Sequence, residues 1–350
     1  MFEPQLSGSR PNMQRINGGH HDGETVKSIF KPVGPNLDFQ YAMSLTWPQP
    51  VMNIQVGNQN VAGNLNSMLA AYDEYYCERL GPDIDPHWPD PFAPDGYQSL
   101  DCGTHTPPNV ISLSYAWSEA GFPQDYLRRQ CGEYLKLGLM GITIIAGTGD
   151  DGTARRHTAC DDAATAGQRR PSHASSPASC PWVTAVGGTM KNLASSSTTA
   201  QRKTVYVRPN TSSTDGFSTV FSAPSYQINS TWACVAAEWR HFRYRNITDL
   251  FDPRGRAVPD ISALATDYLI AFNGEFRRVH GTSASAPVIA FMISMVNNER
   301  LLAGRGRWGL STRFCINTLK CLRTSLMGRI SDVKRAMGSV PSRAGMLRRV

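Results

Sequence analysis

The sequence lacks any apolar run of about eighteen residues, the length that a membrane-spanning helix requires. Its first residues, MFEPQLSGSRPNMQRINGGHHDG, contain no apolar core, so we expect no signal peptide in this chain. None of the eight cysteines belongs to a CxxC pair, which argues against a zinc site. No internal repeat is visible. These absences indicate a globular protein without a membrane segment, a zinc centre or a repeat architecture.

Positive charge is concentrated in the tail of the chain. Residues 301–350 contain eleven Lys and Arg and one Asp, a net charge of +10. Because the whole chain carries +7, the first 300 residues carry about −3. No aromatic residues alternate with the basic residues of the tail in the way that base stacking would need. The charge distribution therefore argues against a nucleic-acid partner.

Apolar runs on either side of a helical pattern predict a parallel sheet. The segments NVISLSYAW (109–117) and ITIIAGTGDDG (142–152) are apolar and rich in β-branched residues, which is typical of buried strands. Residues 123–141 between them carry apolar side chains at helical spacing. Together they form a βαβ unit, which predicts an α/β fold. A further strand is predicted over 180–189, and a loop followed by one more strand over 256–272.

Three polar residues stand where such a fold collects functional groups, at the carboxyl ends of strands and at the start of helices. Asp150 follows the second predicted strand, and Ser283 lies in a Gly-Thr-Ser turn that enters a predicted helix. Asp38 lies about one turn into a helix whose first turn holds Gly34. Each also has a structural interpretation, because Gly-Thr-Ser turns are common, Asp150 can cap a turn and Asp38 can be a solvated carboxylate.

Taken in order, the motifs of the chain resemble those of one family. The sedolisins, or serine-carboxyl peptidases, have segments similar to NLDFQYAM, NVISLSYAW, LRRQCGEYLKLGLMG, GTGDDG, PASCPWVTAVGGT, RAVPDISA and GTSASAP. The fungal tripeptidyl-peptidases are the nearest branch, and the resemblance covers about residues 15–305 except 153–176. It implies a subtilisin-like parallel sheet with helices on both faces. It also implies a secreted, monomeric enzyme that hydrolyses peptide or protein substrates in acid.

The resemblance assigns roles to particular residues. It implies that Ser283 is the nucleophile and that a glutamate, not a histidine, is its base. An aspartate four residues after that glutamate, here Asp38, braces it, since this spacing places both carboxylates on one helix face. Asp150 matches the aspartate at the oxyanion hole, which donates a hydrogen bond while it is protonated. Carboxyl groups in these roles are the reason why such enzymes work in acid.

The expected base is missing from this chain. Gly34 stands four residues before Asp38, where the family has glutamate, so E-x-N-L-D is replaced by G-P-N-L-D. Glu24 lies ten residues before Gly34, too early to share the helix face of Asp38. His280 is close to Ser283 in sequence, but near neighbours along a chain rarely face each other. The sequence therefore predicts a nucleophile without its usual proton acceptor.

The resemblance also implies a calcium site near the end of the chain. In the family it is built from an Asp-Ile or Asp-Val pair and a later G-W-D. Residues 309–350 contain neither motif and only one carboxylate, Asp332, whereas calcium takes about six to eight oxygen ligands. We therefore expect no calcium site, and no other metal site, in this chain.

A shift of reading frame accounts for the divergent segments. Let each new codon take the last base of one residue and the first two bases of the next. Then LSTRFCINTLKCLRTSLMG can be decoded as FVNPLLYKHPEMLTDITDG, and RAGMLRRV as PGWDAATG, which restores family motifs; GQRRPSHASSP becomes RTKATFPRQFP in the same way. We therefore predict a remnant N-terminal segment (1–30), a peptidase domain (31–305) with an atypical, irregular insert (153–176), and a divergent basic tail (306–350).

Two disulfide bonds are predicted. A bond between Cys77 and Cys102 would bracket a turn-rich segment, and a bond between Cys131 and Cys180 would tie the βαβ helix to the next strand. The cysteines of the divergent segments, Cys160, Cys315 and Cys321, should be unpaired. The pairing of Cys234 is left open. Scattered cysteines favour a secreted protein, as do three N-x-S/T sequons at Asn210, Asn229 and Asn246.

Two functions remain open on the sequence alone. The first is an acid peptidase that removes short peptides from N-termini, impaired because its base is absent. The second is a pseudoenzyme or a peptide-binding remnant without turnover, which Gly34 favours. A nucleic-acid-binding protein is a third class, but it is supported only by the charge of the tail.

Overall fold

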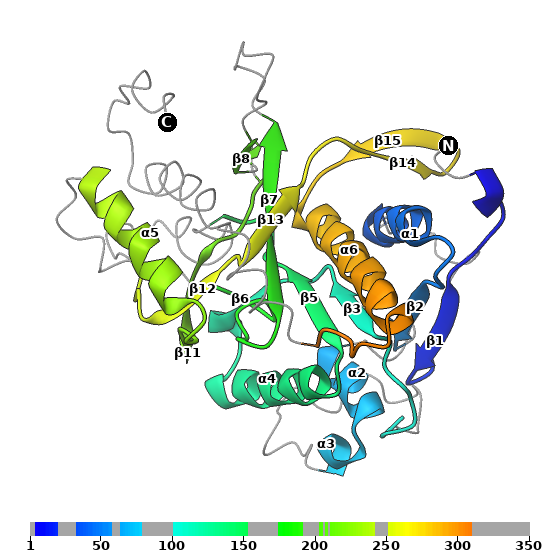
Figure 1. Ribbon diagram of the computed structural model, residues 1–350, viewed down its shortest axis with the longest axis horizontal. Coiled ribbons are helices and arrows are strands. Elements are labelled where there is room, and N and C mark those ends of the chain that lie inside the picture. The colour runs from blue at the N-terminus through cyan, green and yellow to red at the C-terminus, as the bar shows by residue number, and fades with distance from the viewer. Residues whose placement is uncertain are drawn as a thin grey trace, which may run out of the picture.

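The computed structural model describes residues 4–19, 33–57, 64–78, 101–152, 174–191, 203–205, 207–208, 211–241 and 251–309 (Figure 1). Several predictions concern residues outside these ranges, namely the exclusion of Glu24 as the base, most of the insert, the tail beyond 309, and the pairing of Cys160, Cys315 and Cys321. The side chain of Cys234 also lies outside the described part.

A parallel sheet of four strands forms the centre of the molecule. Its order is β13-β7-β5-β3. Strand β8 pairs with the end of β7 in antiparallel orientation. The bounds are Val110–Leu113 (β3), Thr143–Gly147 (β5), Thr184–Lys191 (β7), Lys203–Val205 (β8) and Ile261–Leu264 (β13). The βαβ unit predicted from 109–152 is therefore confirmed, with α4 (Gln124–Leu139) as its crossover helix.

Helices cover both faces of this sheet. Alternate residues of a strand point to opposite faces, so Ile144 packs in one cluster with Leu137 of α4, and Ile145 packs in another with Ile289. The second cluster lies under α6 (Thr282–Leu302) and α1 (Val33–Thr46), which run side by side in Figure 1. The predicted subtilisin-like α/β fold is confirmed.

Shorter elements surround the central layers. They are η1 (Pro4–Leu6), β1 (Asn12–Ile16), β2 (Met52–Val56), α2 (Leu65–Tyr72), α3 (Glu74–Glu78), β4 (Trp117–Ser118), η2 (Glu119–Gly121), β6 (Ser175–Ser176), β9 (Val207–Arg208), β10 (Thr211–Ser212), β11 (Gly216–Ser222), α5 (Ile228–His241), β12 (Gly255–Val258), β14 (Tyr268–Phe272) and β15 (Glu275–Val279). The strands β14 and β15 form an antiparallel hairpin that leads directly into α6.

The prediction for 256–272 is wrong in detail, because this segment forms three strands. Strand β12 pairs with β11, β13 completes the central sheet, and β14 belongs to the hairpin. The one predicted strand corresponds to β14, YLIAF, in which buried and exposed residues alternate. This strand lies outside the main sheet, and the predicted loop contains the two strands before it. The chain changes direction at Pro259, whose peptide bond with Val258 is cis.

Residues at the edges of the two divergent segments contact the rest of the domain. Ala174 is fully buried, and Ser175–Ser176, within the insert expected to be irregular, form β6 against β4. At the other end, Arg307 and Trp308 contact residues of the domain. The Arg307 guanidinium binds Asn109 and the carbonyl of Met140, and the Trp308 backbone N–H donates to Asn297.

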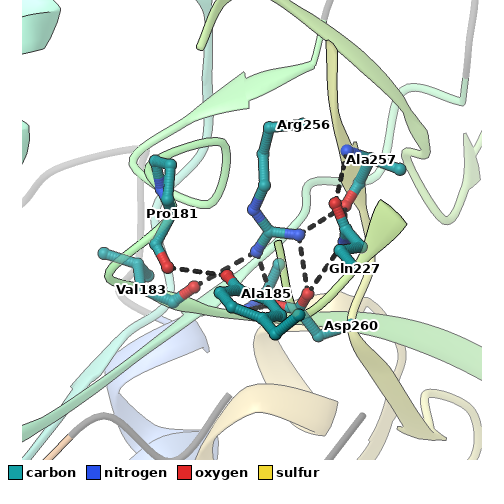
Figure 2. A network of polar contacts seen from close by, with 8 residues as sticks. Pro181, Val183, Ala185, Gln227, Arg256, Ala257 and Asp260 are labelled. Carbon is teal, nitrogen blue, oxygen red and sulfur yellow. Dashed lines mark hydrogen bonds and ion pairs between the residues drawn. The ribbon is translucent and has the colours of Figure 1, made fainter. Parts of the chain in front are cut away.

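A buried ion pair fastens β12 to the sheet (Figure 2). Arg256 and Asp260 are both almost fully buried, and the guanidinium donates to both carboxylate oxygens, at 2.6 and 2.5 Å. The amide of Gln227 bridges the carbonyl of Ala257 and the Asp260 carboxylate, at 2.6 and 3.2 Å. The backbone N–H of Ala185 on β7 completes the ring at 2.8 Å. These bonds compensate the cost of burying two charges.

Both predicted disulfide bonds are present. Cys77–Cys102 joins α3 to the segment that precedes β3, with Cα atoms 5.7 Å apart. Cys131–Cys180 joins α4 to the turn before β7, with Cα atoms 5.5 Å apart. Both separations fall within the usual range for a disulfide.

Candidate active site

The first turn of helix α6 is capped by a side chain from a residue just beyond the end of strand β5. Its N-cap residue, Gly281, has no side chain to satisfy the first N–H groups of the helix. Instead the backbone N–H of Thr282 donates to Oδ1 of Asp150, at 2.7 Å, from just beyond the end of β5. A Cβ atom at Gly281 would lie 2.7 Å from Oδ2 of Asp150, and the φ angle of Gly281 is +142°. Glycine is therefore needed here for both space and conformation.

Two further side chains fix the rotation of this turn. The Thr282 hydroxyl accepts a hydrogen bond from the backbone N–H of Gly149, at 3.0 Å. The Ser285 hydroxyl donates to the carbonyls of Ala263 and Leu264 on β13, at 3.2 and 3.1 Å. The turn, in which Ser283 and Ala284 lie between Thr282 and Ser285, is thus tied to the carboxyl ends of two strands of the sheet.

The carbonyl of Ser283 is freed by a proline and captured by a serine. Pro287 lies inside α6, four residues after Ser283, and has no N–H to donate to that carbonyl. The hydroxyl of Ser114, at the carboxyl end of β3, donates to it instead, at 3.3 Å. This contact satisfies a backbone group that would otherwise be orphaned, and it brings a third strand end to the turn.

Asp38 approaches the same point from α1. The Ser114 hydroxyl interacts with its carboxyl group, and this hydrogen bond lowers the pKa, but burial has the larger effect and raises the pKa of Asp38 from 3.8 to about 7. Its Oδ1 atom is buried and makes no hydrogen bond within the described residues. Asp38 is therefore protonated in mild acid, and one of its oxygens is available to a further partner.

The pKa of Asp150 is also raised, again mainly by burial. The Thr282 backbone N–H and hydroxyl stabilise its charged form and oppose that effect, as does the nearby His280, whereas the neighbouring Asp151 adds to it. A carboxyl group with a raised pKa at a helix N-terminus can carry a proton in acid and donate it in a hydrogen bond.

The base was expected at position 34, which is glycine. Gly34 is half-buried in the first turn of α1, and a Cβ atom built on it would meet no atom of the described residues within 4 Å. With about 3.6 residues per turn, position 34 lies between Asp38 and Tyr41 around the helix. Both of these residues face the interior, since Asp38 contacts Ser114 and Tyr41 packs on Tyr268. A side chain at position 34 would therefore point inward, on the same face as Asp38.

Helix α1 is held against the hairpin that leads to Ser283. The side-chain amide of Gln40 accepts from the backbone N–H of Ala271 and donates to its carbonyl, at 2.9 and 2.7 Å. The hydroxyl of Tyr41 makes the same two contacts with Leu269, both at 3.1 Å. These two side chains take the place of a neighbouring strand along β14, so that α1 and the hairpin are fixed relative to each other.

The structure thus places the three predicted residues around one point. Asp150 touches the residue before Ser283, and Asp38 reaches Ser283 through Ser114. Sequence analysis missed Ser114, which fell inside the strand predicted over 109–117, whereas β3 ends at Leu113 and leaves Ser114 directly after it. His280 is exposed beside this point.

Other candidate sites were sought in the described part of the chain. It holds no group of three or more His, Cys, Asp or Glu side chains that could bind a metal ion. None of its helices is long and apolar enough to cross a membrane. A hollow of about 520 Å³ lies between Trp47 and Met295, at the far ends of α1 and α6. Met295 is twelve residues beyond Ser283, or about 18 Å along the helix, so this hollow is separate from the candidate active site.

Comparison with known proteins was made by sequence and by structure. No family model matches the chain. The chain is 39% identical over 327 residues to tripeptidyl-peptidase SED1 of Arthroderma otae, an alignment that covers 87% of the chain and 48% of that protein. It is 33% identical over 321 residues to tripeptidyl-peptidase sed1 of Aspergillus fumigatus (85% and 49%) and 32% identical over 299 residues to aorsin of Aspergillus oryzae (78% and 45%). The chain spans about half the length of the curated relatives it matches.

Among solved structures, one match supports the fold. A Pseudomonas sedolisin, a serine-carboxyl proteinase complexed with two molecules of pseudo-iodotyrostatin, superposes with a TM-score of 0.56 at 20% identity. The match covers 90% of this chain and 74% of that one. At this level of identity the likeness concerns the arrangement of helices and strands.

Proposed function

Because the chain belongs to the sedolisin family of serine-carboxyl peptidases, we propose that it is a serine peptidase of the tripeptidyl-peptidase type, impaired by the glycine at position 34. Ser283 is the nucleophile, Asp150 the oxyanion donor and Asp38 the brace beside the missing base. The observation that carries this proposal is the contact between Asp150 and the residue next to Ser283. This contact supports the role proposed for Asp150, because it brings a carboxyl group of raised pKa to the turn that holds Ser283.

In the proposed reaction, Oγ of Ser283 attacks the carbonyl carbon of the scissile peptide bond. The carbonyl electrons move to oxygen, and the protonated Asp150 carboxyl donates a hydrogen bond to the oxyanion. The C–N bond then breaks, the amine leaves with a proton, and an acyl ester remains on Ser283. Attack by water on that ester releases the acid and restores the hydroxyl.

Both proton transfers in this scheme need a base, and position 34 does not supply one. Asp38 stays protonated up to about pH 7 and is therefore a poor acceptor in acid. A positioned general base typically contributes about 10²–10⁴-fold to rate, so we expect at least that loss relative to a chain with glutamate at position 34. The acid optimum then reflects Asp150 and Asp38 rather than the missing group.

A second candidate function is a peptide-binding remnant without turnover. Gly34 favours it, because the carboxyl groups that contact the Ser283 turn within the described residues are Asp150 and, through Ser114, Asp38, and neither is the expected base. The two functions share the same fold and the same candidate site. They differ only in whether an acyl ester forms on Ser283.

We propose a secreted, monomeric protein whose partners are peptide substrates. The calcium site that the resemblance implies would fall in the tail, and residues 310–350 lie outside the described part.

The test is release of N-terminal tripeptides from an unblocked peptide at about pH 4, because burial raises the pKa of both Asp38 and Asp150 and so favours their protonated forms in acid. The chain as it stands is compared with Ser283→Ala. Slow release that the serine variant lacks supports the peptidase. Equal rates for the two proteins, with a peptide bound by both, support the binding remnant and overturn the peptidase.

A further inference from the structure

Helix α5 begins with a face that the core holds in place. Gln227 lies just before the helix, and Thr231 and Val235 follow it at intervals of four residues, so the three share one face. All three are buried, with 0%, 4% and 2% of their surfaces exposed. The side-chain amide of Gln227 belongs to the network around the buried ion pair in Figure 2. The first turn of α5 is therefore fixed in its orientation.

Asn229 lies on the opposite side of this turn. At 3.6 residues per turn, positions 229 and 231 are about 200° apart around the helix. Burial of Thr231 therefore turns Asn229 towards solvent, and Asn229 is exposed. It is the first residue of the sequence Asn229-Ser230-Thr231, which has the N-x-T pattern of an acceptor for an N-linked glycan.

The hydroxyl of Thr231 gains nothing from its surroundings in the fold. Its Oγ1 atom is buried and has no hydrogen-bond partner among the described residues. A buried hydroxyl without a partner costs stability, and valine has the same shape without that cost. Packing therefore gives no reason for threonine at this position. The acceptor pattern does give one, because it requires a hydroxyl two residues after the asparagine.

Two apolar side chains are exposed next to Asn229. Ile228 and Trp232 are 40% and 45% exposed and lie four residues apart, on one face of the helix. Trp232 follows Asn229 by three residues, which brings their Cβ atoms to about 5–6 Å from each other. A sugar on Asn229 is therefore within reach of the indole ring, and its C–H groups can pack on the ring face and remove apolar surface from water.

We propose that Asn229 carries an N-linked glycan whose first sugar covers the apolar pair formed by Ile228 and Trp232. The inference rests on the proposed secretion of the protein and not on its peptidase activity. The donor is an oligosaccharide that is joined, through C1 of its first sugar, to a polyprenyl diphosphate. The amide nitrogen of Asn229 bonds to C1 and loses a proton, while the C1–O bond breaks and the diphosphate leaves with its electron pair. Transfer precedes folding, because Thr231 is buried in the finished helix.

The first experiment tests for the glycan. The full chain is secreted from yeast behind a cleavable leader, and peptide-N-glycosidase in heavy-oxygen water then converts each glycosylated asparagine to a labelled aspartate, which mass spectrometry locates. Asn229 should be labelled in the unaltered chain and in Thr231→Ser, and unlabelled in Thr231→Val. An unlabelled Asn229 in the secreted, unaltered chain would overturn the proposal.

The second experiment tests whether the glycan covers the apolar pair. Hydroxyl-radical oxidation of Trp232 is compared between the secreted, unaltered chain and Thr231→Val. Because a sugar on one face of the indole shields that face, oxidation should be about twofold or more slower with the glycan. Trp47 is the matched control, since it is 51% exposed and follows α1, far from α5 in Figure 1. Equal oxidation of Trp232 in the two proteins would refute the covering role.

A third comparison separates the glycan from the fold and from catalysis. Made in bacteria that form disulfides but attach no glycans, Thr231→Val should melt at the same temperature as the unaltered chain or higher. A lower melting temperature would show that the fold uses the hydroxyl, and would count against the proposal. Tripeptide release should be equal in these two proteins, because Thr231 is outside the candidate active site. A glycosylated but inactive protein would therefore refute the peptidase function alone.

Discussion

Asp38 should make the protein less stable as pH rises, and replacing it by asparagine should remove that dependence. Burial raises the pKa of Asp38 from 3.8 to about 7, so the folded protein holds this proton more tightly than the unfolded chain does. The resulting stability is fully present below about pH 3.8. It is lost as the pH rises through about 7, because the folded state must then bury a charge.

The size of the effect follows from the two pKa values. The interval from 3.8 to about 7 corresponds to about 4 kcal/mol, at about 1.36 kcal/mol per pH unit. Asp38 is half-buried rather than completely enclosed, so water will screen part of this cost. We therefore expect Asp38→Asn to be more stable than the unaltered chain by about 2–4 kcal/mol at pH 8 and nearly equal to it at pH 3.

The assay is urea denaturation of both proteins at pH 3, 5 and 8, with the difference in the free energy of unfolding plotted against pH. Asp125→Asn is a useful control because it removes an exposed carboxylate, 96% accessible, and so reports the general effect of net charge. A difference between Asp38→Asn and the unaltered chain that does not change with pH would refute the reasoning. So would a variant that is less stable at pH 8.

Three other changes have definite expected outcomes. Replacing Arg256 by Met should lower the free energy of unfolding by about 3–5 kcal/mol in urea, because its carboxylate partner stays buried; a loss below about 1 kcal/mol would contradict the ion pair's role. Replacing Cys131 and Cys180 by Ala should cost about 4 kcal/mol, since the bond spans 49 residues, and the difference should vanish when both proteins are measured reduced. Gly281→Ala should cost about 1–3 kcal/mol and slow labelling of the nucleophile by a fluorophosphonate, because its Cβ atom would crowd Asp150. Unchanged melting and labelling would contradict that explanation.

The sheet and its crossover helix could be predicted because their patterns are local. The run from Val110 to Leu113, the helical spacing in α4 and the run from Thr143 to Gly147 each follow from which residues must be buried. Once the strands are parallel, their carboxyl ends share an edge, which is why Asp150 could be placed near the turn that holds Ser283.

Contacts between distant segments could not be predicted in the same way. The bond between Ser114 and Ser283 depends on Pro287, which removes the usual helix partner of a carbonyl. Nothing in any one of these three segments specifies that they meet. The clamp of Gln40 on β14 has the same character, since it joins residues that are 231 positions apart.

The turn that holds Ser283 is fixed by groups other than residue 34, so the fold does not depend on a carboxylate at that position. Asp150 caps the helix, Ser114 binds the carbonyl of Ser283, and Gln40 ties α1 to the hairpin. A glutamate at position 34 would add a second carboxyl group on the helix face of Asp38. Two neighbouring carboxylates repel each other once both ionise, and this repulsion opposes folding. Glycine in a helix costs only about 0.5–1 kcal/mol relative to alanine. Under the proposed function, glycine at position 34 is therefore nearly neutral for stability, and a chemical assay is needed to detect its effect.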